Sequence, residues 1–234
     1  MRLLIVGHGR MGQLVEGLAP EYGFEVAGIL EIDSNPDGSG VTPERCRGVD
    51  VAVDFSTAEA TLATVPRLAA AGVNLVVGTT GWQDREAEIR SAVERCGVGA
   101  VVAANFSLGA NLTNALAETM GRLLRDKEAY GAWIHEAHHK AKRDAPSGTA
   151  VMLQRALEDA GYGRGVDVSS TRVGWVPGTH TVGFDGPAES LTLTHTVRDR
   201  ATFAHGALEA ARWVAGRKGW HTMRDVLGLA PTTG

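Results

Sequence analysis

Residues 2–12 read RLLIVGHGRMG and join an apolar run to a glycine-rich turn. The run, residues 2–6, is short, rich in Leu, Ile and Val, and ends at a glycine, as is typical of a β-strand buried on both faces. The next residues follow the pattern G-x-G-x-x-G and lead into a helical spacing of apolar residues. Such glycines permit a tight turn, close approach of the backbone to a pyrophosphate, and close packing of helix on strand. We therefore predict a dinucleotide-binding turn, in preference to a plain glycine-rich turn, from Gly7, His8, Gly9, Arg10, Met11 and Gly12.

An acidic residue stands where such a turn needs one. Glu31 follows Gly12 by 19 residues, at the end of the next apolar run. A carboxylate in this place bonds the ribose 2′-hydroxyl of NAD and repels the 2′-phosphate of NADP. Ile32 follows it, without a neighbouring Lys or Arg, although Arg10 in the turn could reach a 2′-phosphate. The sequence therefore favours NADH, with NADPH as the alternative.

Strand and helix patterns alternate through the first half of the chain. Strands are predicted at 24–30, 49–55, 72–77 and 98–104, and helices at 10–19, 58–70 and 83–95. This alternation predicts an α/β fold, a Rossmann-like doubly wound parallel sheet with helices on both faces. Two polar segments follow the fourth and fifth strands, at the edge where such sheets bind ligands. We expect either cofactor contacts or ordinary turns from Gly78, Thr79 and Thr80, and from Ala104, Asn105, Phe106 and Ser107.

The pattern changes near residues 106–111. A helix is predicted at 109–125, a strand at 129–137, a helix at 149–159, then three strands separated by Pro177-Gly178 and Asp185-Gly186. The last strand, 189–197, alternates, with His195 on its apolar face, where a core or interface histidine is expected. A final helix is predicted at 202–215. The second half therefore predicts a smaller α+β domain with an antiparallel or mixed sheet.

Composition excludes several classes of function. The chain has 234 residues, 44% of them hydrophobic and 21% charged, with a net charge of −4 and no basic tract. Nucleic acid and an anionic membrane surface are therefore not expected as partners. No apolar run is long enough to span a membrane, and Cys46 and Cys96 lack metal-site or disulfide spacing. We expect a cytoplasmic protein.

The densest chemistry lies in residues 135–149, which read HEAHHKAKRDAPSGT. Three histidines and three basic residues fall within nine positions of an otherwise acidic chain, which favours a small anionic substrate over a solvated loop. The Pro-Ser-Gly-Thr run then opens a helix, whose free N–H groups can bind a carboxylate. A zinc site from His135, His138 and His139 is disfavoured, because no fourth ligand is near and the lysines would repel the ion.

The stretch from Glu136 to Thr149 strongly resembles the signature of the 4-hydroxy-tetrahydrodipicolinate reductase (dihydrodipicolinate reductase) family. Further matches are Gly-Arg-Met-Gly at 9–12, Asp-Phe-Ser at 54–56, Gly-Thr-Thr-Gly at 78–81, Ala-Asn-Phe-Ser at 104–107 and Val-Pro-Gly-Thr at 176–179. Phe184, Glu189, His195 and the run Arg-Ala-Thr-Phe-Ala-His-Gly-Ala at 200–207 also match. The resemblance implies reduction of the cyclic dicarboxylic acid made from pyruvate and aspartate semialdehyde, on the diaminopimelate route to lysine.

The resemblance also implies roles for particular residues. His138 is expected to donate the proton and Lys142 to assist it, while His139, Gly148 and Thr149 contact the substrate carboxylates. The cofactor contacts are the two strand-end segments, the glycine-rich turn and Glu31, to which Arg200 and Phe203 are added; by themselves those two could equally be a surface arginine and a core aromatic. No metal is expected.

Family architecture gives the expected domains and assembly. The resemblance implies a discontinuous dinucleotide-binding domain, 1–107 with 201–234, and a substrate-binding and tetramerisation domain, 108–200, within a homotetramer. Two departures concern the cofactor: the glycine turn is one residue shorter than in many members, and Ile32 stands where many have Arg. The alternatives are another two-domain NAD(P)-dependent dehydrogenase of a small anionic substrate, or a dinucleotide-sensing module, which would not need His138 and Lys142.

Overall fold

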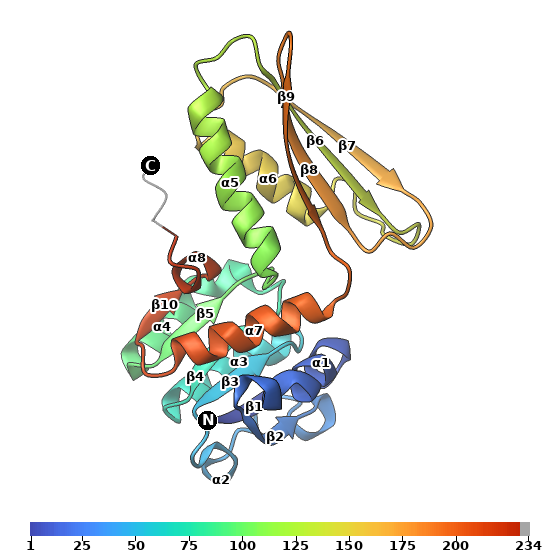
Figure 1. Ribbon diagram of the computed structural model, residues 1–234. Coiled ribbons are helices and arrows are strands. Elements are labelled where there is room, and N and C mark those ends of the chain that lie inside the picture. Colours follow the sequence, from blue (N-terminus) through green and yellow to red (C-terminus); the bar gives the residue numbers. More distant parts are fainter. Residues whose placement is uncertain (230–234) are drawn as a thin grey trace. The chain divides into compact units, whose positions relative to one another are not determined.

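A computed structural model describes residues 1–229 (Figure 1), so that the last five residues of the expected 201–234 segment lie outside the described part. The chain separates into two compact units. The first comprises Met1–Leu108 together with the segment that begins at Ala201, and the second comprises Gly109–Arg200. Among the described residues, no helix combines the length and apolar character that crossing a bilayer requires.

The first unit is built on a six-stranded parallel sheet in the order β10-β5-β4-β3-β1-β2. Its strands are β1 (Arg2–Val6), β2 (Glu25–Leu30), β3 (Val51–Asp54), β4 (Asn74–Val77), β5 (Gly99–Val102) and β10 (Gly219–His221). The parallel Rossmann-like sheet is thereby confirmed, with strand ends shifted by a few residues. The prediction missed β10, because its three residues Gly-Trp-His carry no aliphatic run and form a strand through pairing with β5.

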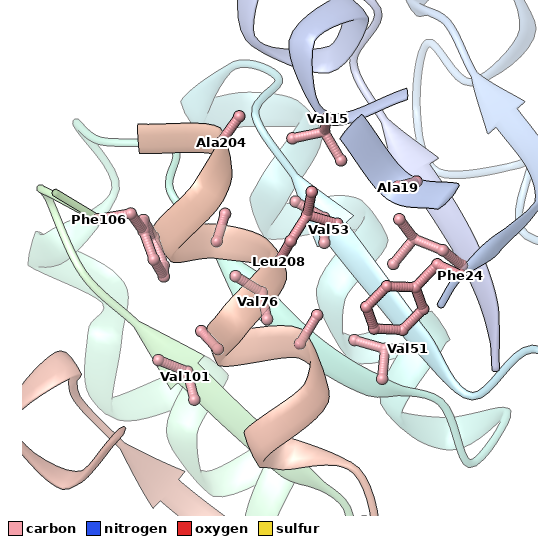
Figure 2. Packing of buried hydrophobic residues seen from close by; sticks show 14 of the residues in the cluster. Val15, Ala19, Phe24, Val51, Val53, Val76, Val101, Phe106, Ala204 and Leu208 are labelled. Carbon is pink, nitrogen blue, oxygen red and sulfur yellow. The ribbon is translucent and has the colours of Figure 1, made fainter. Parts of the chain in front are cut away.

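Helices cover both faces of this sheet. On one face, α1 (Arg10–Leu18) and α7 (Ala201–Val214) pack on the strands through Val15, Ala204 and Leu208, as Figure 2 shows. On the other face, α3 (Ala58–Ala70) and α4 (Glu86–Cys96) bury Leu68 and Ile89. The shorter helices are η1 (Ala19–Tyr22), η2 (Ile32–Ser34), α2 (Pro43–Cys46), η3 (Gln83–Arg85) and α8 (Met223–Val226). The strands are therefore apolar on both sides, as their continuous hydrophobic runs require.

The second unit has a four-stranded mixed sheet in the order β7-β6-β8-β9. Its strands are β6 (Gly131–His138), β7 (Val166–Arg172), β8 (Thr179–Asp185) and β9 (Ser190–Thr196). The β6–β7 pair is parallel and the other pairs are antiparallel, which settles the sequence alternatives in favour of a mixed sheet. Helices α5 (Leu108–Leu124) and α6 (Gly148–Asp159) enclose a core with one face of this sheet, including Ile134, Val182 and Phe184.

The opposite sheet face is polar. Thr181 pairs with Thr194, and Thr179 with Thr196, through hydroxyl contacts of 3.0 and 3.1 Å. His195 lies half-buried on the other side of β9, where a Cβ on Gly109 would come within 2.6 Å of its Nε2. Burial lowers the pKa of His195, so that it is a packed, neutral histidine at pH 7, in agreement with its alternation in the strand.

Candidate active site

The glycine-rich turn of the first unit leaves no room for side chains at two of its glycines. Gly7 has φ +85°, and a Cβ there would lie 2.6 Å from the carbonyl oxygen of Phe55. A Cβ at Gly12 would lie 2.1 Å from the carbonyl oxygen of Gly7. Gly9 precedes α1 and offers no side-chain cap, so the first N–H groups of this helix are left for a ligand. This cradle fits the pyrophosphate of a dinucleotide.

A cleft of about 510 Å³ lies beside this turn. Of the predicted cofactor residues, Gly7, His8, Gly9 and Glu31 line it; Arg10 is exposed and Gly12 is buried beneath the turn. His8 contacts Glu16 at 2.7 Å and Glu31 at 3.5 Å, so its side chain connects the turn to α1 and to the end of β2. Sequence reasoning did not assign the remaining lining residues, which are Val6, Gln13, Leu30, Ile32, Asn35, Phe55, Ser56, Thr57 and Ala60.

A buried carboxylate joins the carboxyl ends of β3 and β4. Asp54, only 1% exposed, accepts hydrogen bonds from the Ser56 amide (2.9 Å), Thr61 (2.8 Å) and Thr79 (3.1 Å). Burial raises the pKa of Asp54, and these donors oppose that rise. The Thr79 hydroxyl also accepts from the Ser56 amide at 2.9 Å, so this predicted contact residue holds the two loops together. In the sequence, only the Asp-Phe-Ser match at 54–56 pointed to Asp54 as a residue of this site.

The other strand-end residues divide into buried and open positions. Gly78 lies against the ring of Phe55, since a Cβ at Gly78 would be 2.1 Å from a ring carbon. The ring of Phe106 meets that of Phe55 edge-to-face, with centroids 6.0 Å apart. Ser107 is buried and its amide donates to Asn105 at 2.8 Å. Thr80 and Ala104 are exposed. Met11 and Phe203 are half-buried, and Arg200 is exposed at the end of the second unit.

In the second unit, the functional side chains gather at the end of β6. His138 is the last residue of this strand, whereas the predicted strand, 129–137, left it in the following loop. Glu136, two positions earlier on the same face, is fully buried, and its Oε2 bonds Nδ1 of His138. Arg172, the last residue of β7, donates to both oxygens of Glu136, at 2.6 Å to Oε1 and 2.9 Å to Oε2. Charge on one buried carboxylate is thus shared by an arginine and a histidine.

His180 and Ser147 complete this cluster. The rings of His138 and His180 meet edge-to-face with centroids 5.0 Å apart, and Nε2 of His180 lies 3.0 Å from Oγ of Ser147. The same Oγ accepts from the Ala150 amide at 3.3 Å and so caps α6, while the Ser147 amide donates to Glu136 at 3.3 Å. The alternation of β6 could have placed Glu136 beside His138. Arg172 and His180 come from distant strands, and no local pattern marks them.

The predicted anion contacts lie around the start of α6. Gly148 and Thr149 are its first two residues, exposed and half-buried, and belong to the first turn, whose N–H groups have no partner within the helix. The Gly148 amide instead bonds the Asp144 carboxylate, and the bonds from Lys142 and Gly148 lower the pKa of Asp144. Lys142 is mostly buried and pairs with Asp144 at 2.9 Å; His139 is half-buried. His135 points to the opposite sheet face, where it contacts Thr171 at 3.0 Å, so the three histidines do not converge.

The electrostatics of the cluster follow from burial and pairing. Hydrogen bonds from Arg172 and His138 outweigh the burial of Glu136 and lower its pKa to about 2. Burial lowers the pKa of His138, and the charges of Lys142 and Arg172 add to this, against the opposing effect of Glu136. Burial lowers the pKa of His180 to about 4, which keeps it neutral. At neutral pH the cluster therefore has a charged carboxylate and a histidine that releases its proton readily.

Glu136, His138 and His180 are also the one group in residues 1–229 whose ligand atoms lie close enough together for a metal ion, all within 4.8 Å. Both Glu136 oxygens, however, already accept hydrogen bonds from the guanidinium of Arg172. A second cation at this carboxylate would be repelled. The donor set therefore suits an internal ion pair better than a metal.

Comparison with known proteins identifies the family. The family model "Dihydrodipicolinate reductase, N-terminus" matches residues 1–106, and "Dihydrodipicolinate reductase, C-terminus" matches residues 109–227. A 4-hydroxy-tetrahydrodipicolinate reductase from Laribacter hongkongensis is 38% identical, with 98% of each chain covered. One from Methanoregula boonei is also 38% identical, with 96% of each chain covered.

Solved structures agree with this fold. A dipicolinate-bound dihydrodipicolinate reductase from Paenisporosarcina sp. TG-14 superposes with a TM-score of 0.80 at 21% identity, covering 95% of this chain and 97% of that one. An amine dehydrogenase from Mycobacterium smegmatis shares the fold more distantly, with a TM-score of 0.57 at 14% identity, covering 100% and 97%. With both family models matched in order and relatives covered nearly end to end, the chain belongs to the dihydrodipicolinate reductase family of oxidoreductases.

Proposed function

We propose that this protein reduces 4-hydroxy-tetrahydrodipicolinate to tetrahydrodipicolinate, with loss of water, in lysine and diaminopimelate biosynthesis, and that His138 supplies the proton. Family membership supports the reaction. The observation that supports His138 as the proton donor is its bond to the buried carboxylate of Glu136, close to the first turn of α6. Residues 1–107 with the segment from 201 hold the cofactor, and residues 108–200 hold the substrate. NAD(P)H, held at the glycine-rich turn, supplies the hydride.

His138 has one nitrogen fixed and one available. The Glu136 carboxylate can only accept, so Nδ1 of His138 carries the hydrogen of their bond. No described residue bonds Nε2, and a Cβ on Gly178 would approach it to 3.0 Å, so the glycine there leaves this nitrogen accessible. Once hydride has been added to the ring carbon conjugated with the imine, negative charge is left on the adjacent carbon. Nε2–H of the imidazolium then protonates that carbon.

The substrate's carboxylates are the proposed ligands of the basic loop and of α6. The N–H groups of Gly148 and Thr149 point from a capped helix start, where a carboxylate is favoured. His139 and Lys142 add positive charge or donors from the preceding loop, and Lys142 exchanges its contact with Asp144 for the substrate. Binding of the dicarboxylate thus places its ring beside His138, and the same lysine favours proton release.

A coupled absorbance assay tests this assignment. The upstream synthase generates the substrate in place from pyruvate and aspartate semialdehyde, and oxidation of NADH or NADPH is followed. His138→Gln should lower kcat about 10²–10⁴-fold while dinucleotide binding is kept. His135→Gln is the matched control, because it lies on the same strand but on the opposite face, and its rate should be unchanged once light scattering has shown a wild-type mass for the variant. Equal rates for the two variants would remove His138 from the role of donor.

Lys142→Ala tests the contribution of the loop. We expect a lower kcat and a higher KM for the dicarboxylate, because the variant loses a cation that is mostly buried beside His138. The KM for the dinucleotide should stay within about twofold. A wild-type rate and dicarboxylate KM would show that Lys142 is not part of the site.

NADH is the proposed favoured cofactor. Glu31 borders the cleft with an exposed carboxylate, and the neighbouring Ile32 offers no charge to a 2′-phosphate. Glu31→Ala should raise the ratio of kcat/KM for NADPH to that for NADH by about tenfold, because it removes both a hydroxyl acceptor and a repulsive charge. An unchanged ratio would refute this basis for the preference.

A homotetramer in the cytoplasm is the proposed setting. The polar sheet face around Thr181 and Thr194 is open within the chain and is the proposed contact surface. Light scattering should give about four times the chain mass of 24.6 kDa, and Thr194→Arg should lower that value. A monomeric mass for the unaltered chain would exclude the assembly. Both cysteines are free, which suits a reducing compartment.

A further inference from the structure

Arg172 occupies an unusual position relative to the histidine. In the parallel register of β6 and β7, Arg172 stands directly opposite His138, yet its guanidinium turns to Glu136. Its two terminal nitrogens bond one carboxylate oxygen each, and Oε2, the oxygen bonded by Nη1, is also the one that bonds His138. Arginine and histidine therefore compete for the same negative charge, inside a carboxylate that is fully buried.

Within residues 1–229, four charged or titratable groups face His138 from the elements around it. They are Glu136 from its own strand, Arg172 from β7, His180 from β8 and Lys142 from the following loop. His180 is neutral at pH 7, as its lowered pKa requires. Lys142 and Arg172 disfavour the imidazolium, and Glu136 alone favours it. Proton affinity at His138 thus depends on how much of the Glu136 charge Arg172 neutralises.

We propose that Arg172 is a positioning residue that sets the proton affinity of His138 through Glu136, weakening the hold of the carboxylate on the imidazolium so that the proton can be given to the substrate. Glu136 alone would bind the proton too firmly for transfer, and Arg172 alone would expel it. This inference rests on the proposed role of His138 as donor, but the ionisation it describes is measurable without the reaction.

A purely structural role is the competing explanation for Arg172. Its Nη2 also donates to the backbone oxygen of Asp144 at 2.6 Å, and Asp144 holds Lys142. As a mere anchor of that loop, Arg172 would affect activity through the shape of the loop. The two explanations differ in one respect. Only an electrostatic role of Arg172 predicts that the loss of Arg172 and the loss of Glu136 move the ionisation of His138 in opposite directions.

The test is the titration of His138, followed by NMR of histidine-labelled full-length protein, in the wild type and in Arg172→Met and Glu136→Gln. Arg172→Met should raise the titration midpoint by about one pH unit, because the guanidinium then no longer neutralises the charge of Glu136. Glu136→Gln should lower it by about one unit, because the cation of Arg172 is left facing the ring. Arg172→Lys keeps the charge and should stay close to the wild type.

The pH profile of kcat, measured in the coupled assay, shows whether the ionisation of His138 controls turnover. Its alkaline limb should move up in Arg172→Met and down in Glu136→Gln, by the same amounts as the NMR midpoints. Midpoints that shift in the same direction, or not at all, would overturn the proposal. Opposite NMR shifts with an unmoved kcat profile would uphold charge sharing and refute His138 as the donor. If Arg172→Met does not fold, Arg172→Gln takes its place, and a midpoint at or below that of the wild type there overturns the proposal.

Discussion

Replacing Gly12 by Ala tests how the glycine-rich turn is built. A Cβ at this position would lie 2.1 Å from the carbonyl oxygen of Gly7, and ordinary contact begins near 3.4 Å, so helix and turn must separate by about 1.3 Å. Both atoms belong to, or are attached to, backbone, so no side-chain rotation relieves the conflict. Overpacking of this kind costs about 1–3 kcal/mol, and occasionally more. An approach of 2.1 Å to a backbone atom places the cost at the upper end of this range, about 3 kcal/mol. The helix itself gains about 1 kcal/mol from Gly→Ala, so we expect a net loss of about 2 kcal/mol.

Gly17 provides the matched control, because it lies in the same helix, is exposed, and has no atom within 4 Å of an added Cβ. Gly17→Ala should therefore stabilise the protein by about 0.5–1 kcal/mol. For a chain of this size, Tm should fall by about 4–8 °C in Gly12→Ala and rise by about 2 °C in Gly17→Ala.

Differential scanning fluorimetry gives the Tm, and calorimetric titration with NADH gives the affinity. The Kd for NADH should rise tenfold or more in Gly12→Ala, because the moved turn no longer presents its N–H groups to the pyrophosphate, and should stay within twofold in Gly17→Ala. Equal stability and equal NADH affinity of the two variants would refute the reasoning that close packing at Gly12 shapes the site.

Three further perturbations probe other contacts. Gly206→Ala places a Cβ 1.8 Å from the carbonyl oxygen of Phe106 and should destabilise the first unit by about 3 kcal/mol in chemical unfolding; a wild-type midpoint would contradict it. Ser147→Ala removes the cap of α6 and the partner of His180, and should cost about 1–2 kcal/mol, with a higher KM for the dicarboxylate. The pKa of Glu136, about 2 in the folded protein and thus below its ordinary 4.5, means that its pairing stabilises the fold above pH 4.5 and is lost as the pH falls toward 2. The free energy of unfolding should therefore fall by about 3 kcal/mol between pH 4.5 and pH 2 in the wild type, and by less in Glu136→Gln. Parallel pH curves for the two proteins would show that the ion pair does not contribute to this pH dependence.

Local sequence patterns determined much of the fold because the forces behind them are local. The continuous apolar runs predicted five of the six parallel strands, since a strand buried on both faces has to be apolar throughout. The alternation around His195 placed it correctly on the inner side of β9. The short strand β10 escaped prediction because pairing with β5, and not composition, makes its three residues a strand.

The candidate site shows the same division. Gly7 and Gly12 were recognisable from sequence because a turn that approaches a neighbouring backbone excludes every Cβ, and that requirement is written into residue type. His138 and Lys142 were singled out by a local cluster of basic residues and by a family resemblance. Their setting was not evident, because the residues that charge and orient His138 arrive from other strands.

By itself, then, the sequence determined the element types, the parallel sheet, the glycine-rich turn and the family, all of which depend on spacing and residue type within short segments. Only the tertiary structure decided that Arg172 lies opposite His138, that His180 packs on its ring, and that Glu136 is buried between them. The physical reason is that the proton affinity of a histidine depends on the charges and solvent around it, and strand pairing brings Arg172 of β7 and His180 of β8 to His138 from distant parts of the chain.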